Sequence, residues 1–135
     1  MAVGAPPGGR RTSTTPPPGP GTYGFWVALD HFAPGVMQDF TAEDVVLFAP
    51  AEASWAVVRT DPASGTTVVD HGGTRDIWAQ AEDVHARWVR AGRPQRYRIE
   101  VAAGGTQHVT SGTGAQRLEW QLPTPPSGRP SVGTS

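Results

Sequence analysis

The sequence predicts an α+β domain, in which a small antiparallel β-sheet packs against one amphipathic helix and both ends of the chain are disordered tails. Three observations support this prediction. One long segment has the apolar spacing of a helix, several short segments alternate apolar and polar residues, and both ends are rich in Pro and Gly. We expect a tail or linker over residues 1–22, an α+β domain over 23–123 and a second tail over 124–135.

The composition limits the ligands that this chain is expected to bind. It has 135 residues with 11 Lys plus Arg and 12 Asp plus Glu, and the two signs are interspersed, which argues against a nucleic acid or a membrane as the main partner. Because the chain has no cysteine, it can form no disulfide, zinc–thiolate site or thiol nucleophile. It shows neither the apolar core of a signal peptide nor a run of about 20 apolar residues, so a cytoplasmic protein is expected.

The N-terminal part of the chain offers little to bury. Residues 1–22 cannot offset the entropy lost on ordering, so a flexible tail or linker is expected there. Order is expected to begin at Tyr23. The apolar run at residues 25–29 is too short for its period to separate a strand from a helix, and we favour a strand. Pro34 and Gly35 then mark a turn.

Three strands are expected before the helix. Residues 45–49 form a continuous apolar run that Pro50 ends. Residues 54–60 alternate, and residues 66–70 do so more weakly. The segment 61–65, DPASG, has good turn chemistry, because Pro fixes φ and Gly tolerates a positive φ. These two runs are therefore expected to form a β-hairpin.

Residues 74–94 contain the only convincing helix pattern, and the rest of the domain is organised around it. Thr74 is expected to cap its N-terminus, with Asp76 placing negative charge near the positive end of the helix dipole. Gly92 and Pro94 are expected to end it. The apolar residues recur at helical spacings and form one broad face that must be buried: Ile77, Trp78, Ala81, Val84, Trp88 and Val89.

Three strands are expected after the helix. Residues 96–102 alternate most cleanly, with Tyr97, Ile99 and Val101 expected to point inward. Residues 107–110 are expected to pair back on them. Residues 117–122 close the domain, with one apolar face made of Leu118, Trp120 and Leu122.

Two motifs were tested for chemistry and neither assigns a site. Gly112 and Gly114 precede a strand pattern rather than a helix N-terminus, so a turn is preferred to a phosphate loop. Glu82 and His85 share one helix face, but a di-metal bundle needs two such pairs on several helices. We therefore expect no catalytic, cofactor-binding or metal-binding residue in this chain.

The end of the helix and the strand after it provide the candidate binding residues. Guanidinium groups there can hold a carboxylate or a peptide backbone, and Trp88 can add a flat stacking surface. The alternative is a solvated rim over a core tryptophan, which is favoured because Trp88 is in phase with the buried face of the helix. The candidate contacts to a peptide or partner are Trp88, Arg90, Arg93, Arg96 and Arg98.

Several of these features occur together in a known family. They are the aromatic strand SWAVV, a hairpin ending in Gly-Gly, the helix start at Arg75, Ile77 and Trp78, the helix end RWVRAGRP, and the strand RYRIEV. This pattern resembles the C-terminal region of actinobacterial protein-L-isoaspartate O-methyltransferase-like proteins, which include enzymes that methylate peptide carboxylates during ribosomal peptide maturation. The resemblance covers about residues 23–123, and residues 72–101 are its specific part.

The resemblance implies a module joined to a Rossmann-like catalytic domain that binds S-adenosylmethionine. That domain has no counterpart in this sequence, so none of its cofactor or catalytic residues is carried over. We therefore expect a detached C-terminal module, a truncated product or a misplaced start codon. The leading hypothesis is an accessory module of a carboxyl methyltransferase system, inactive alone, whose partner is the catalytic domain or a peptide substrate.

Two alternatives come from other classes of protein. The first is a free-standing interaction domain that binds a peptide along an exposed sheet edge, with the arginines selecting acidic residues. The second is a small enzyme that uses His85 with Glu82, which requires the two side chains to converge in a pocket.

Overall fold

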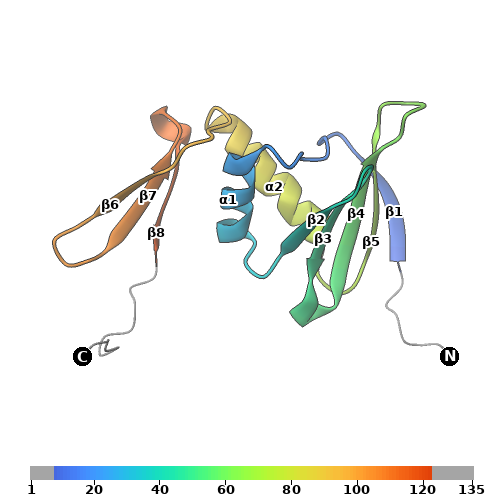
Figure 1. Cartoon of the computed structure of the whole chain (residues 1–135), viewed down its shortest axis with the longest axis horizontal. Coiled ribbons are helices and arrows are strands. Elements are labelled where there is room, and N and C mark those ends of the chain that lie inside the picture. The colour runs from blue at the N-terminus through green and yellow to red at the C-terminus, as the bar shows by residue number, and fades with distance from the viewer. Residues whose placement is uncertain (1–7, 123–135) are drawn as a thin grey trace.

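The computed structural model describes residues 8–122, which form an α+β fold with two α-helices and two antiparallel β-sheets. Figure 1 shows the helices between the two sheets. The elements follow in the order β1 (Gly8–Ser13), α1 (Tyr23–Phe32), β2 (Met37–Phe40), β3 (Val45–Ala49), β4 (Ser54–Thr60), β5 (Thr67–Gly72), α2 (Ile77–Arg90), β6 (Arg98–Val101), β7 (Gln107–Ser111) and β8 (Leu118–Leu122).

The predicted fold class is confirmed, but the expected single sheet is two sheets. A five-stranded sheet has the order β1-β5-β4-β3-β2, and a three-stranded sheet has the order β6-β7-β8. The large sheet lies on the side of α2 and the small sheet on the side of α1 (Figure 1). The predicted hairpin is confirmed as β4 and β5, with Trp55 opposite Gly72 at one end and Thr60 opposite Thr67 at the other.

The helix predicted over residues 74–94 is α2, although it starts later than expected. Asp76 rather than Thr74 is the N-cap, because its carboxylate accepts a hydrogen bond from the backbone N–H of Ala79. At the other end, the N–H of Gly92 donates to the carbonyl of Val89 and the N–H of Arg93 to that of Trp88. These two bonds form a Schellman motif, and Gly92 takes the positive φ of 95° that the motif requires.

The apolar face of α2 is buried as predicted. Trp78 and Ala81 have no exposed surface, and Ile77, Val84 and Trp88 are also buried. They pack against the helix-facing side of the large sheet, where Leu47, Ala56, Val58 and Val69 are fully buried. Burial of large aromatic and aliphatic side chains in one cluster supplies most of the stability of such a small domain.

The strand preferred for residues 25–29 is wrong, because these residues belong to helix α1. Phe25, Ala28 and Leu29 turn to the same core as α2, with helical rather than alternating spacing. Gly24 allows the chain after α2 to come very close, since a Cβ there would lie 1.7 Å from the carbonyl oxygen of Pro94. Packing between the two helices therefore decides a conformation that the local sequence leaves open.

The expectation of a tail over residues 1–22 is also wrong for its described part. Strand β1 pairs with β5 along its whole length and forms an edge of the large sheet. Three polar contacts hold it in place: Arg10 to Asp70, Arg11 to Asp76 and Ser13 to Glu82, each at 2.6 Å. Main-chain pairing and charge order this segment in the absence of apolar burial. Residues 1–7 and the predicted tail at 124–135 lie outside the described residues.

The strands predicted after α2 are confirmed as β6, β7 and β8, but one prediction about their faces is wrong. Ile99 and Val101 were expected to point into the core, and they are 57% and 65% exposed. The small sheet touches α1 through the ring of Trp120, which stacks on His31, and through the hydroxyl of Tyr97, which donates to the carbonyl of Gly24. These contacts cover Tyr97 and Trp120 and leave all four residues of β6 in solvent.

Candidate functional site

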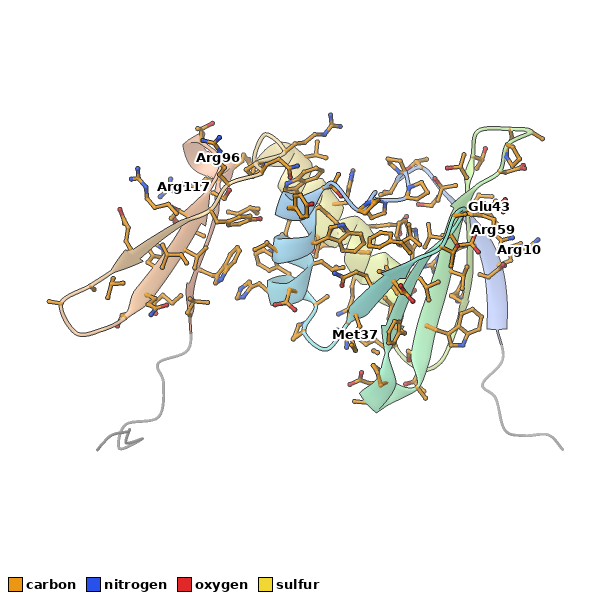
Figure 2. The ribbon with its side chains drawn as sticks, in the orientation of Figure 1. Arg10, Met37, Glu43, Arg59, Arg96 and Arg117 are labelled. Atoms are coloured by element: carbon orange, nitrogen blue, oxygen red, sulfur yellow. The ribbon has the colours of Figure 1, made fainter. Side chains whose placement is uncertain are left out.

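The arginines predicted to form one binding cluster are divided among three separate hollows. Arg90 lines a hollow with Arg87 and Arg117, between the end of α2 and the start of β8. Arg93 lies beside the segment 16–19. Arg96 and Arg98 line a third hollow beside β7. In Figure 2, the labelled Arg96 and Arg117 lie on the small sheet, away from Arg10 and Arg59 on the large one.

Trp88 belongs to the core, as its phase in the helix predicted. Its side chain lies among the buried residues and only 6% of the residue is exposed. The indole N–H donates to the carbonyl of Pro94 at 2.8 Å, and the ring meets that of Phe25 edge-on at 6.0 Å between centroids. Trp88 therefore fixes the end of α2 and does not offer a flat surface to a ligand.

The side chains of Glu82 and His85 contact different residues and do not form a catalytic pair. The carboxylate of Glu82 accepts a hydrogen bond from the hydroxyl of Ser13. The ring of His85 lies 5.8 Å from those of Phe25 and Trp88, between centroids. Burial, with the nearby guanidinium of Arg93, lowers the pKa of His85. Within residues 8–122, no group of three or more His, Cys, Asp or Glu side chains is placed to hold a metal ion.

The lowered pKa of His85 predicts that stability falls with acidity in a defined range. The unfolded chain takes up the proton near pH 6.5, whereas the folded chain resists it, so protonation favours unfolding below that pH. Urea unfolding of the wild type is therefore expected to give a lower midpoint at about pH 5.5 than at about pH 7.5. In His85→Phe the difference between the two midpoints is expected to shrink.

Two further variants test whether His85 causes this difference between the midpoints: a control substitution and a substitution of a second histidine. Val89→Ala, a substitution in α2 that changes no ionisable group, should keep the wild-type difference between the two midpoints. The pKa of His31 is also lowered by burial, so part of the difference is expected to remain in His85→Phe and to shrink further in the double variant His31→Phe with His85→Phe. A His85→Phe chain with the full wild-type difference contradicts the assignment.

The surface that the sequence did not single out is the outer face of the large sheet, the face turned away from both helices. Both helices cover the opposite side of this sheet (Figure 1). Phe48 lies opposite Trp55 and Val46 opposite Val57 in the sheet register, and all four are half-buried. Met37 and Val68 lie on the same side of the sheet as these four residues. The apolar residues of the outer face are therefore Met37, Val46, Phe48, Trp55, Val57 and Val68.

The ring of Trp55 lies flat across this face because two glycines make room for it. A Cβ at Gly72 would come within 2.7 Å of the indole, and one at Gly8 would come within 3.5 Å. The ring therefore covers the main chain of the edge strand and forms a shallow hollow with Val57 and Arg10. A flat aromatic residue fixed on a sheet is well suited to act as an anchor in a protein interface.

Charged groups lie beside this apolar centre, most of them toward one end of the sheet. Arg10 makes two hydrogen bonds to the carboxylate of Asp70, at 2.6 and 3.0 Å, and lowers the pKa of that group. Arg59 pairs with Asp44 at 3.1 Å. Figure 2 shows Arg10, Glu43 and Arg59 near one end of the sheet and Met37 near the other. An apolar centre with a polar rim is the usual anatomy of a protein–protein interface.

The signal for this face was present in the sequence. Strand β4 alternates two apolar sets, Trp55 and Val57 on one side and Ala56 and Val58 on the other. A strand with apolar residues on both sides is typical of a sheet that is covered on both faces. The pattern was sufficient to predict the strand, and it also indicated a second covering layer.

Comparisons with models of known protein families, with curated proteins and with solved structures gave no match to this chain. None of the helices in the described part combines the length and the apolar character needed to cross a membrane.

Proposed function

We propose that this chain is an accessory module of an S-adenosylmethionine-dependent carboxyl methyltransferase system and that it has no catalytic activity alone. In this proposal it docks on the methyl-transferring domain through the outer face of its large sheet. The observation that carries the proposal is the apolar outer face, which neither helix covers and which charged residues border at one end. We propose a cytoplasmic protein or peptide partner rather than a nucleic acid or a membrane.

The residues on which the family resemblance rests support this proposal, because each of them has a structural role in the fold. Gly72 makes room for Trp55, and Gly73 takes a φ of 95° where a Cβ would lie 2.4 Å from Ser54. Trp78 is fully buried, and the AGRP segment closes the Schellman motif. These residues build a framework rather than a reactive centre, so what the resemblance supports is a shared module.

The docking proposal is tested with the carboxyl methyltransferase domain encoded in frame with this chain or in a neighbouring gene. Binding is measured by calorimetry with the purified chain. Val57→Lys, which places a charge in the middle of the outer face, is expected to weaken binding about tenfold or more. Val27→Lys makes the same kind of change on α1, where Val27 is exposed, and should bind as the wild type does.

Three results would overturn the proposal. The first is micromolar binding of S-adenosylmethionine by the purified chain, or transfer of its methyl group without a partner. The second is equal binding by Val57→Lys and the wild type, which would exclude the outer face. The third is a genome with no methyltransferase reading frame beside this one.

A second candidate function is favoured by the exposed strand β6. A free-standing interaction domain can add a peptide strand to an open sheet edge, and Ile99 and Val101 would then be covered. An isolated gene whose product binds peptides with Val57→Lys unaffected would favour this candidate.

A further inference from the structure

Strand β6 is an open edge of the small sheet. It pairs with β7 on one side, and Figure 1 shows it as the outermost strand of that sheet. All four of its residues are exposed, and two of them are the large apolar residues Ile99 and Val101. An open, exposed edge of this kind is a template for pairing with another strand.

The main chain of β6 presents its free groups at alternate residues. The N–H of Ala102 donates to the carbonyl of Thr106 across the hairpin, so Ala102 faces β7. In an antiparallel pair the direction of these groups alternates along the strand, so Arg98 and Glu100 also face β7. The N–H and C=O groups of Ile99 and Val101 therefore point to the open edge.

The side chains of β6 divide between the two faces of the small sheet. Arg98 and Glu100 share one face, where their charged groups lie 3.7 Å apart. Ile99 lies on the other face, in register with Val109 and, beyond it, with Trp120. Arg98 and Glu100, which carry opposite charges, therefore flank the single apolar residue Ile99 along the strand.

This arrangement is self-complementary under a two-fold axis. In an antiparallel pair of identical strands, residues opposite each other share a face. Centring the axis on Ile99 places Ile99 opposite Ile99 of the second copy, and Arg98 opposite Glu100 twice. Centring it on Arg98 or on Glu100 places like charges opposite each other, which is unfavourable.

The main chain permits the register that the side chains favour. With the axis at Ile99, the free N–H and C=O groups of Ile99 meet their symmetry mates and form a hydrogen-bonded pair. Arg98 and Glu100 then occupy the pairs without mutual main-chain bonds, in which side chains come closest. Each of the four charges obtains an opposite charge on its own strand and another on the partner strand.

We propose that two copies of this chain pair through β6, with the axis at Ile99, to form a continuous six-stranded antiparallel sheet. Such a contact is isologous, since Arg98 of each copy meets Glu100 of the other. It covers Ile99 and removes the open edge. This pairing uses the small sheet and does not depend on the outer face of the large sheet or on the methyltransferase proposal.

The other edge strands of the described sheets differ from β6. Strand β1 has only basic charged residues and β2 only an acidic one, so a two-fold pairing of either edge gains no reciprocal ion pair. At the β8 edge, Arg117, Leu118 and Glu119 repeat the order found in β6, but Arg117 precedes the strand and Leu118 is buried, whereas Ile99 is exposed. The composition of β6 therefore selects a second copy at that edge in particular.

The test uses charge reversal and sedimentation velocity of the full chain over a range of concentrations. The wild type is expected to show a reversible monomer–dimer equilibrium. Arg98→Glu and Glu100→Arg each place like charges opposite each other at both ends of the pair, and each is expected to weaken dimerisation about tenfold or more. A mixture of the two variants restores opposite charges at both positions and is expected to dimerise as the wild type does.

The matched control is Arg117→Glu. It reverses the same kind of charge in an exposed Arg–Glu pair, that of Arg117 and Glu119 beside β8, and is expected to leave dimerisation unchanged. Circular dichroism confirms that each variant is folded, and recovery of the dimer in the mixture shows that both variants keep the edge intact. A wild type that stays monomeric at all concentrations overturns the proposal. This holds even if the monomer binds a different peptide at β6. Dimers that persist in both single variants also overturn it.

Discussion

Replacing Trp88 with alanine is expected to lower the free energy of unfolding by about 3–5 kcal/mol. The indole is buried, it contacts Phe25 and His85, and its N–H holds the carbonyl of Pro94 at the end of α2. Removing the ring leaves a cavity between the two helices and releases the segment that leads to the small sheet. Urea unfolding followed by circular dichroism measures the loss.

Trp88→Phe separates the ring from its hydrogen bond. Phenylalanine keeps most of the apolar contact but leaves the carbonyl of Pro94 without its donor, so a smaller loss of about 1–2 kcal/mol is expected. Val89→Ala, at the half-buried neighbouring position, serves as a control for helix α2. If Trp88→Ala is as stable as the wild type, Trp88 is not a core residue, and the interpretation of its ring as an exposed stacking surface is favoured instead.

Trp78→Ala is expected to have an effect of similar size, about 3–5 kcal/mol, because Trp78 has no exposed surface and lies in the first turn of α2. Trp78→Phe is expected to behave differently from Trp88→Phe. The indole N–H of Trp78 is buried and has no hydrogen-bond partner among the described residues.

Removing that unpaired donor offsets part of the lost contact, so Trp78→Phe is expected to stay within about 1 kcal/mol of the wild type. The same urea measurement tests this expectation. If Trp78→Phe costs as much as Trp78→Ala, the whole indole is needed and the unpaired N–H carries no cost.

The sequence predicted the elements that depend on a local pattern. Helix α2 has a clear apolar face and clear end signals, and the β4–β5 hairpin has both alternation and a turn sequence. The burial of Trp88 was also predicted from its position on the apolar face of the helix. In each case neighbouring residues contain the information.

The elements that were missed depend on distant partners. Helix α1 is a helix because Phe25 meets Trp88 of α2 and Gly24 meets Gln95 in the chain after it, 71 positions further on in the second case. Strand β1 is ordered by Asp70 and Asp76, which no local pattern around residues 8–13 reveals. The arginines after α2 diverge because the Schellman motif and Pro94 turn the chain between them.

The candidate site was only partly accessible from the sequence. Apolar residues on both sides of β4 were visible, but which side the helices cover was not. The edge pairing proposed for β6 needs the register and the direction of the main-chain groups, which come from the fold alone.

The contact between Arg11 and Asp76 has a consequence for how the molecule opens. The same carboxylate starts helix α2 and anchors the first strand, so the ionic contacts that help main-chain pairing to hold this strand are ones that salt screens and acid removes. Its detachment costs less than unfolding of the core, which apolar burial holds. Raising the ionic strength is therefore expected to loosen the edge of the large sheet beside Trp55 before the apolar core unfolds.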